Sequence, residues 1–239
     1  HNNSNNTSLG YSSLSGGANT NNTAVGYQAA LNLTGDSNTV MGSNAMGTGT
    51  HTGNYSSAFG TNALANSTTG NNDAFGTSTL MNVTTGTANA AFGRGALQNN
   101  TSNYNCAFGH EAMQTNTSGN QNTAVGKGAL YSNQSGTNNV AIGKHALYNC
   151  TNSGNVAIGE YAGGAVTTGD SNVFVGKNVG GITNGVHNIM FGYDYTVGNQ
   201  SNLIGFNNSS QTITVSGSAS SWSFSSDGRD KTDIVDLTL

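Results

Sequence analysis

Charged residues, proline and cysteine are all scarce in this sequence: 7% of its 239 residues are charged, two are cysteine and none is proline. Two cysteines are too few for a disulfide-stapled scaffold, and no apolar run reaches the ~18 residues of a membrane-spanning helix. The net charge of −4 is small for a disordered chain, and the few basic residues make a poor track for nucleic-acid phosphates. These scarcities predict a protein with no transmembrane helix and no nucleic-acid partner.

Glycine, asparagine and small apolar residues are abundant instead, and they recur in a repeat of the form N-x-A-Φ-G, where Φ is a large apolar residue. Successive repeats are 16 to 18 residues apart, which is typical of a repeat architecture rather than of a disordered tail. The repeat glycine falls at Gly10, Gly26, Gly42, Gly60, Gly76, Gly93, Gly109, Gly126, Gly143, Gly159, Gly176 and Gly192.

Each position of the repeat has its own chemical character, as the unit NNVAIGKHALYNCTNSG (138–154) illustrates. The residue before the glycine is large and apolar, and the one before that is usually alanine. Alanine returns three residues after the glycine and is usually followed by leucine or methionine. The unit closes with asparagine, threonine, serine and glycine, which are turn residues.

A unit of this length cannot bury an apolar face alone, so successive units must stack. It is long enough for two brief strands and two turns, which predicts an all-β fold: a parallel β-solenoid of about 12–13 coils of 16–17 residues, roughly 60 Å long. Because adjacent residues of a strand face opposite ways, the alanine and Φ positions must lie on different faces. One of those faces then needs cover from partner chains, and trimeric packing about a fibre axis would supply it.

The chain divides into three parts by composition. Residues 1–206 carry the repeats and form the predicted rod. Residues 207–226 contain alternating apolar residues that predict capping or transition strands outside the repeat. Residues 227–239 are abruptly charged: Asp227, Arg229, Asp230, Lys231, Asp233 and Asp236 lie within ten positions.

The repeats NTAVGYQAAL (22–31) and NNVAIGKHAL (138–147) resemble those of two related groups of proteins. One is the head domain of trimeric autotransporter adhesins, a left-handed parallel β-roll that trimerises, and the other is the repeat rod of phage tail fibres. The resemblance covers about residues 7–206 and implies a homotrimer. The period is longer here than in the adhesin heads, since the xALxxxT segment adds residues to each coil.

The charged segment SDGRDKTDI (226–234) resembles the start of the intramolecular chaperone domain of endosialidase-type tail spikes and fibres. That family trimerises through the chaperone and then releases it by self-cleavage. The resemblance implies a cut between Ser226 and Asp227, with Ser226 as nucleophile and Lys231 as its base. Asp230 stands where the family usually has leucine and is expected to raise the pKa of Lys231, which weakens a base. Residues 227–239 are too few for the whole domain, so we expect a truncated start.

These resemblances imply a structural and receptor-binding segment of a viral or phage tail fibre, located in the virion. Its expected partners are two further copies of the chain, other tail proteins, and a host cell-surface glycan or receptor. The alternative is the head of a bacterial trimeric surface adhesin, located on the cell. Apart from a single self-cleavage we expect no enzyme activity, because the six acidic residues of the rod are widely scattered.

The position directly after the repeat glycine holds all four basic residues of the rod. Stacking would align them in one stripe, which is either a groove for a glycan or a solvated outer column in which Glu160 offsets the lysines. We expect no metal and no cofactor: His110 and His145 fall two coils apart, in adjacent positions predicted to face opposite ways. The candidate binding residues are Arg94, Lys127, Lys144, Lys177, Tyr27 and Tyr193.

Overall fold

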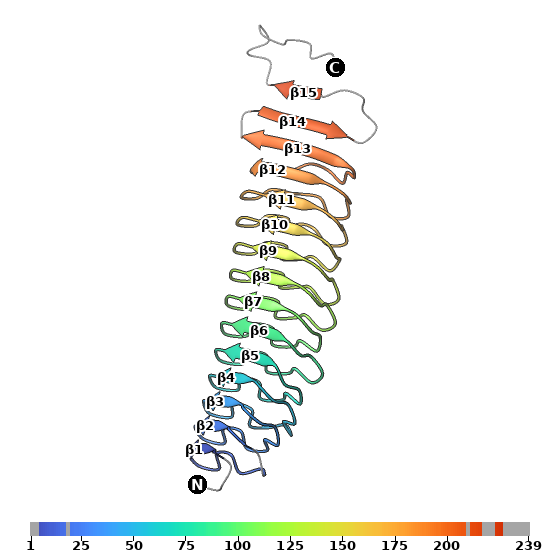
Figure 1. Ribbon diagram of the computed structural model, residues 1–239. Helices are drawn as coiled ribbons and strands as arrows, with labels where there is room; N and C mark the ends of the chain where they lie inside the picture. The colour runs from blue at the N-terminus through green and yellow to red at the C-terminus, as the bar shows by residue number, and fades with distance from the viewer. Residues whose placement is uncertain (1–4, 18–19, 209–210, 217–222, 227–239) are drawn as a thin grey trace.

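The computed structural model describes residues 5–17, 20–208, 211–216 and 223–226, which form a slender stack of coils with β1 at one end and β15 at the other (Figure 1). Within this part of the chain there are fifteen strands in one sheet and no helix, hence none long and apolar enough to span a bilayer. The strands are β1 (Thr7–Leu9), β2 (Thr23–Val25), β3 (Thr39–Met41), β4 (Ser57–Phe59), β5 (Asn72–Phe75), β6 (Asn89–Phe92), β7 (Cys106–Phe108), β8 (Thr123–Val125), β9 (Val140–Ile142), β10 (Val156–Ile158), β11 (Val173–Val175), β12 (Ile189–Tyr193), β13 (Leu203–Asn208), β14 (Gln211–Ser216) and β15 (Ser223–Ser226).

Strands β1 to β13 pair in parallel, each with the strand of the next coil. Equivalent repeat positions pair with one another, as Ala107 does with Ala124 and Phe108 with Val125. The predicted parallel β-solenoid is therefore confirmed, with about 12 coils. At its C-terminal end β14 and β15 add antiparallel strands to the same sheet, within the segment 207–226.

The core of the rod is a row of alanines facing a row of larger aliphatic side chains. In β7 the middle residue, Ala107, is fully buried, and the same holds for the equivalent alanines of the neighbouring coils. The pair that follows the glycine, such as Ala112 and Met113, is also fully buried. The alanine and Φ positions do face opposite ways, as predicted, and alanine is the one that faces inward.

Each coil contains one strand, so the prediction of two strands per coil was wrong. The second apolar segment is a turn in which every other residue is left-handed, with φ of 58° at Glu111 and 50° at Met113. This backbone turns Ala112 and Met113 inward together, which a strand cannot do. The turn is held to the next coil by backbone hydrogen bonds, such as that from Met113 N to Ala129 O at 2.9 Å.

A buried column of asparagines runs beside the alanine row, at the first position of the repeat. The Asn122 Oδ1 accepts a hydrogen bond from the backbone N of Asn139 (2.9 Å), and its Nδ2 donates to Asn105 Oδ1 (3.2 Å) and to the carbonyl of Gly136 (2.8 Å). These bonds satisfy polar groups that the coil buries at its corner. The column comprises Asn22, Asn38, Asn72, Asn89, Asn105, Asn122, Asn139, Asn155, Asn172 and Asn188, with Ser56 taking one place.

One buried histidine makes the rod sensitive to acid. His51 is 2% exposed and lies in the longest coil, bridged to Leu33. Burial lowers its pKa from 6.5 to about 4, against a smaller opposite effect of the nearby backbone of Ala65. Neither ring nitrogen of His51 has a hydrogen-bond partner among the described residues. The unfolded chain therefore binds a proton more readily, so stability is lost as the pH falls from about 6.5 towards 4.

We expect this histidine to cost the wild-type rod about 3 kcal/mol of unfolding free energy between pH 7.5 and pH 4. His51→Leu, which places there the residue type that Leu33 provides one coil earlier, should remove that part of the loss. Urea denaturation of both proteins at the two pH values measures the difference. Equal losses in wild type and variant would show that His51 is not the group responsible.

Candidate functional site

The outer face of the sheet is covered by the Φ column. In each short strand the middle residue points inward and the two flanking residues point out, so Φ is half-exposed along the whole rod; Phe108, for example, is 40% exposed. Four phenylalanines stack with ring centroids 4.5 to 4.8 Å apart. The column consists of Leu9, Val25, Met41, Phe59, Phe75, Phe92, Phe108, Val125, Ile142, Ile158, Val175, Phe191 and Phe206.

A second outward column lies beside the first, and its character changes along the rod. In the N-terminal half it is mostly small or polar, with Thr39, Asp73 and Cys106 among its members. In the C-terminal half it is aliphatic: Val140, Val156, Val173, Ile189 and Ile204. We refer to the Φ column and these five residues as the apolar face.

Most of the predicted binding residues lie on the turn that follows each strand, outside the apolar face, and Tyr193 is the last residue of β12. Lys144 and Lys177 both reach Glu160, with Nζ–Oε distances of 3.2 and 3.3 Å. Hydrogen bonds from Lys144 and then Lys177 lower the pKa of Glu160, and the bond to Glu160 raises the pKa of Lys177. This is the arrangement expected of a solvated outer column, and at this exposure it adds little stability.

The remaining candidates are spread along the rod. Tyr27 is 51% exposed and stacks on Tyr11 at 5.5 Å near the N-terminal end, whereas Tyr193 is 50% exposed in β12. Lys127 makes no ion pair within the described residues. The structure therefore brings Lys144 and Lys177 together but separates the two tyrosines, so the six residues do not form one site.

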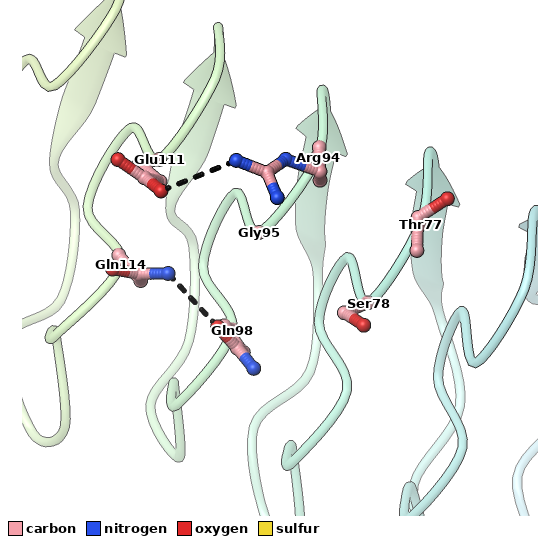
Figure 2. A pocket seen from close by; sticks show the side chains of 7 residues that line it. All are labelled: Thr77, Ser78, Arg94, Gly95, Gln98, Glu111 and Gln114. Carbon is pink, nitrogen blue, oxygen red and sulfur yellow. Dashed lines mark hydrogen bonds and ion pairs between the residues drawn. The ribbon is translucent and has the colours of Figure 1, made fainter.

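Arg94 belongs to a small cavity of about 160 Å³ (Figure 2). The cavity lies over Gly95 and is bordered by Ser78, Glu111 and two glutamines, Gln98 and Gln114. Its charges balance, since the Arg94 guanidinium Nη2 lies 3.6 Å from Glu111 Oε1. Arg94 also donates to His110 Nε2 from its Nε at 2.9 Å.

An aromatic cluster lies on the turns that follow strands β8, β9 and β10, a few coils beyond the cavity. Tyr131 and Tyr148 stack at 5.0 Å, and the His145 ring meets Tyr148 and Tyr161 edge-on at 4.9 and 5.0 Å. Lys144 Nζ lies 5.3 Å from the centre of the Tyr161 ring. Burial is the main cause that lowers the pKa of His145, with Lys144 next. The cluster is a flat, amphipathic surface next to the charged column.

The contact between Lys144 and Tyr161 also corrects an expectation. The two positions after the glycine were predicted to face opposite ways, yet both line the cavity and the aromatic cluster. The reason is that the backbone there is a left-handed turn rather than a strand. His110 and His145 nevertheless form no shared site, and the described residues contain no group of three His, Cys, Asp or Glu side chains that could hold a metal.

The two cysteines and the predicted cleavage residues can be placed only in part. Cys106 and Cys150 are both free, with Cys106 half-exposed on the outer face of β7 and Cys150 buried. Ser226 is the last residue of β15, where it pairs with Gln211. Asp227 and Lys231 lie outside the described residues, so self-cleavage between Ser226 and Asp227 stays a prediction.

Two features of the surface and core were missed by the sequence reasoning. One is the asparagine column, whose signal was the asparagine that opens nearly every repeat unit. The other is the cavity, whose signal was a glycine two residues after the repeat glycine, at Gly95, where most coils have a polar or aromatic residue.

No protein-family model, curated protein or solved structure matches the chain. The functional argument therefore rests on the rod and its surfaces.

Proposed function

We propose that this chain is a structural and receptor-binding rod of a viral or phage tail fibre, carried in the virion and assembled as a homotrimer through its apolar face. The observation that carries the proposal is the unbroken Φ column on the outside of a narrow, rigid solenoid. A rod of this kind holds a binding surface at a distance, and it needs a partner to cover that column.

The size of the apolar face supports assembly. A large aromatic side chain presents about 200 Å², so one that is 40% exposed, as Phe108 is, leaves roughly 80 Å² in contact with water. The column holds six phenylalanines and seven smaller apolar residues, so it exposes on the order of several hundred Å². With its aliphatic neighbours added, it exceeds the roughly 300–600 Å² of the largest patch on a typical monomer. Identical copies are the natural partner, since equivalent positions meet when rods pack about a common axis.

The charged segment after the rod favours a tail fibre over a bacterial adhesin. SDGRDKTDI (226–234) resembles the start of a trimerising chaperone domain, which tail spikes and fibres carry and adhesin heads do not. Self-cleavage between Ser226 and Asp227, with Lys231 as base, is part of this proposal. A bacterial trimeric adhesin remains the alternative, with the same rod on a cell surface.

Cys106 offers a direct test of the assembly because it lies on the outer sheet face while Cys150 is buried. If copies pack through this face, the Cys106 thiols of neighbouring chains meet at one height along the axis. A short bismaleimide should then join chains into covalent dimers on a denaturing gel. Size-exclusion chromatography with light scattering should give three times the chain mass.

Matched variants decide whether the apolar face is responsible. Cross-linking should disappear in Cys106→Ser and persist in Cys150→Ala. Ile142→Asp, on the apolar face, should convert the trimer to monomer, whereas Tyr104→Asp, on an exposed turn, should leave it intact. A monomeric wild-type rod, or a trimer indifferent to Ile142→Asp, would reject assembly through this face.

A further inference from the structure

The position two residues after the repeat glycine shows where a side chain has been omitted. Most coils place a polar or aromatic residue there in left-handed conformation, for example Gln28 with φ of 53°, Glu111 with 58° and Tyr161 with 58°. Gly95 has φ of 68° and Gly128 has 61° at the same position. At Gly128 the place is filled, because a Cβ there would lie 2.6 Å from the His145 ring, and only Gly95 borders the cavity. Since side chains adopt this conformation in neighbouring coils, the backbone does not require glycine at position 95. What glycine provides there is space.

The space over Gly95 is the cavity of about 160 Å³, about ten times what one ordered water needs. Figure 2 shows Arg94, Glu111, Gln98 and Gln114 around it, with Ser78 on the side of the preceding coil. Its lining side chains all carry polar groups, and the exposed lining is mostly polar, unlike the apolar core beneath it. The cavity therefore suits a small polar molecule rather than an apolar side chain or lipid.

Several hydrogen-bond donors and acceptors of the lining form no hydrogen bond with another lining residue. Gln114 Nε2 donates to Gln98 Oε1 at 2.9 Å, which leaves the amide Nε2 of Gln98 and the Oε1 of Gln114 without a hydrogen bond among the described residues. The Ser78 hydroxyl makes none there either. The cavity thus presents both donors and acceptors that form no hydrogen bond with other described residues.

The charges of the lining select against an anion. Glu111 lies 3.6 Å from Arg94 and 3.4 Å from the His110 ring, so the guanidinium has no surplus positive charge for a carboxylate or phosphate. A ligand with several adjacent hydroxyl groups, each of which donates and accepts, fits such a balanced ring of amides, carboxylate and guanidinium.

We propose that the cavity over Gly95 binds one neutral sugar unit of a cell-surface glycan. The assignment rests on the proposed receptor-binding function and names its ligand class and place. None of the lining residues belongs to the apolar face, so packing of copies through that face leaves the cavity open. Each site is small and binds weakly, and the repetition of the site in a trimer raises the overall avidity.

The test uses saturation-transfer NMR on the full chain with free glucose, galactose and N-acetylglucosamine as neutral probes and N-acetylneuraminic acid as an anionic probe. We expect at least one neutral sugar to receive saturation from the wild-type rod, and more than the anionic probe does. Gly95→Gln fills the cavity with the residue that Gln28 provides in another coil, and should reduce the signal at least fivefold.

Asn62→Gln is the matched control, since it enlarges a side chain at the same repeat position two coils away and should leave the signal within twofold. Thermal unfolding followed by circular dichroism checks that both variants fold. The assignment is overturned if no neutral sugar is saturated, if the anion is preferred, or if Gly95→Gln loses less than twofold.

The oligomeric state of the same samples separates this proposal from the fibre assembly. A trimer that binds none of the neutral sugars overturns the sugar site and leaves the assembly standing. A monomer whose cavity binds a neutral sugar overturns the assembly and leaves the sugar site standing.

Discussion

Gly109→Ala is expected to lower the unfolding free energy of the rod by about 2–6 kcal/mol, or to prevent folding altogether. Gly109 has φ of 141°, a conformation that side chains rarely adopt, and a Cβ built there would lie 2.5 Å from the carbonyl O of Gly126. That oxygen belongs to the backbone of the next coil, so it cannot swing away as a side chain could. The added methyl group must therefore separate two coils whose strands β7 and β8 are hydrogen-bonded.

The same geometry recurs at every repeat glycine, with φ between 122° and 150° from Gly10 to Gly192. This is the physical reason why the glycine defines the repeat. Gly198→Ala is the matched control, because a Cβ there has nothing within 4 Å, and it should change stability by less than about 0.5 kcal/mol. Chemical denaturation followed by circular dichroism measures both. Equal effects of the two variants would mean that the coils can spread to admit a methyl group.

The stacking of coils could be predicted because the sequence repeats at a nearly constant spacing. A strict spacing places equivalent residues side by side in a parallel sheet, so the pairing of Ala107 with Ala124 follows from the alignment of repeats. The opposition of the alanine and Φ positions follows from strand geometry. Which of the two faces inward is decided by room: the interior between the strand and the opposite turn already holds the larger side chain of Met113 or Leu130, and a small residue fits across from it. The larger Phe174 takes this position where its ring lies over Gly163.

The turns could not be predicted because their conformation runs against residue preference. Met113, Leu130 and Glu111 are left-handed, although long apolar and acidic side chains seldom are. Hydrogen bonds between coils compensate, such as Leu130 N to Ala146 O at 3.0 Å. The conformational preference of a single residue does not include hydrogen bonds between coils. The sequence therefore predicted two strands per coil, where the structure has one strand and one turn.

The candidate site was less predictable than the fold. The sequence marked Arg94 and Lys144 by their charge and offered a column in which Glu160 offsets the lysines, which the ion pair of Lys144 with Glu160 bears out. Only the coordinates show that Arg94 borders a cavity. The cavity is made by a missing side chain, which a sequence pattern records only as one glycine among 35. Its position becomes informative once the turn geometry of the other coils is known.

Asn122→Leu is expected to destabilise the rod by about 1–3 kcal/mol, since it leaves the buried backbone N–H of Asn139 without a partner. The carbonyl of Gly136 loses one bond but keeps the one from Asn133 Nδ2 at 3.0 Å. The Asn122 amide is 1% exposed, accepts the N–H of Asn139 at 2.9 Å and donates to the carbonyl of Gly136 at 2.8 Å. Leucine fills a similar volume but offers neither bond. Added apolar burial cannot compensate fully, because the unpaired N–H of Asn139 belongs to the main chain and no substitution removes it.

Two further variants separate the hydrogen bonds from the loss of packing. Asn122→Ser should cost less than leucine, because Ser56 occupies this column in the wild type and its Oγ accepts the N–H of Asn72 at 3.2 Å. Asn149→Leu removes a comparable bond, from Nδ2 to the carbonyl of Gly164 at 2.9 Å, at an exposed position where water takes its place. Denaturation midpoints should therefore rank Asn122→Leu lowest and Asn149→Leu close to wild type. If Asn149→Leu were as costly as Asn122→Leu, burial would not be what makes the asparagine column stabilising, and the corner of each coil would have to be held by its turn geometry instead.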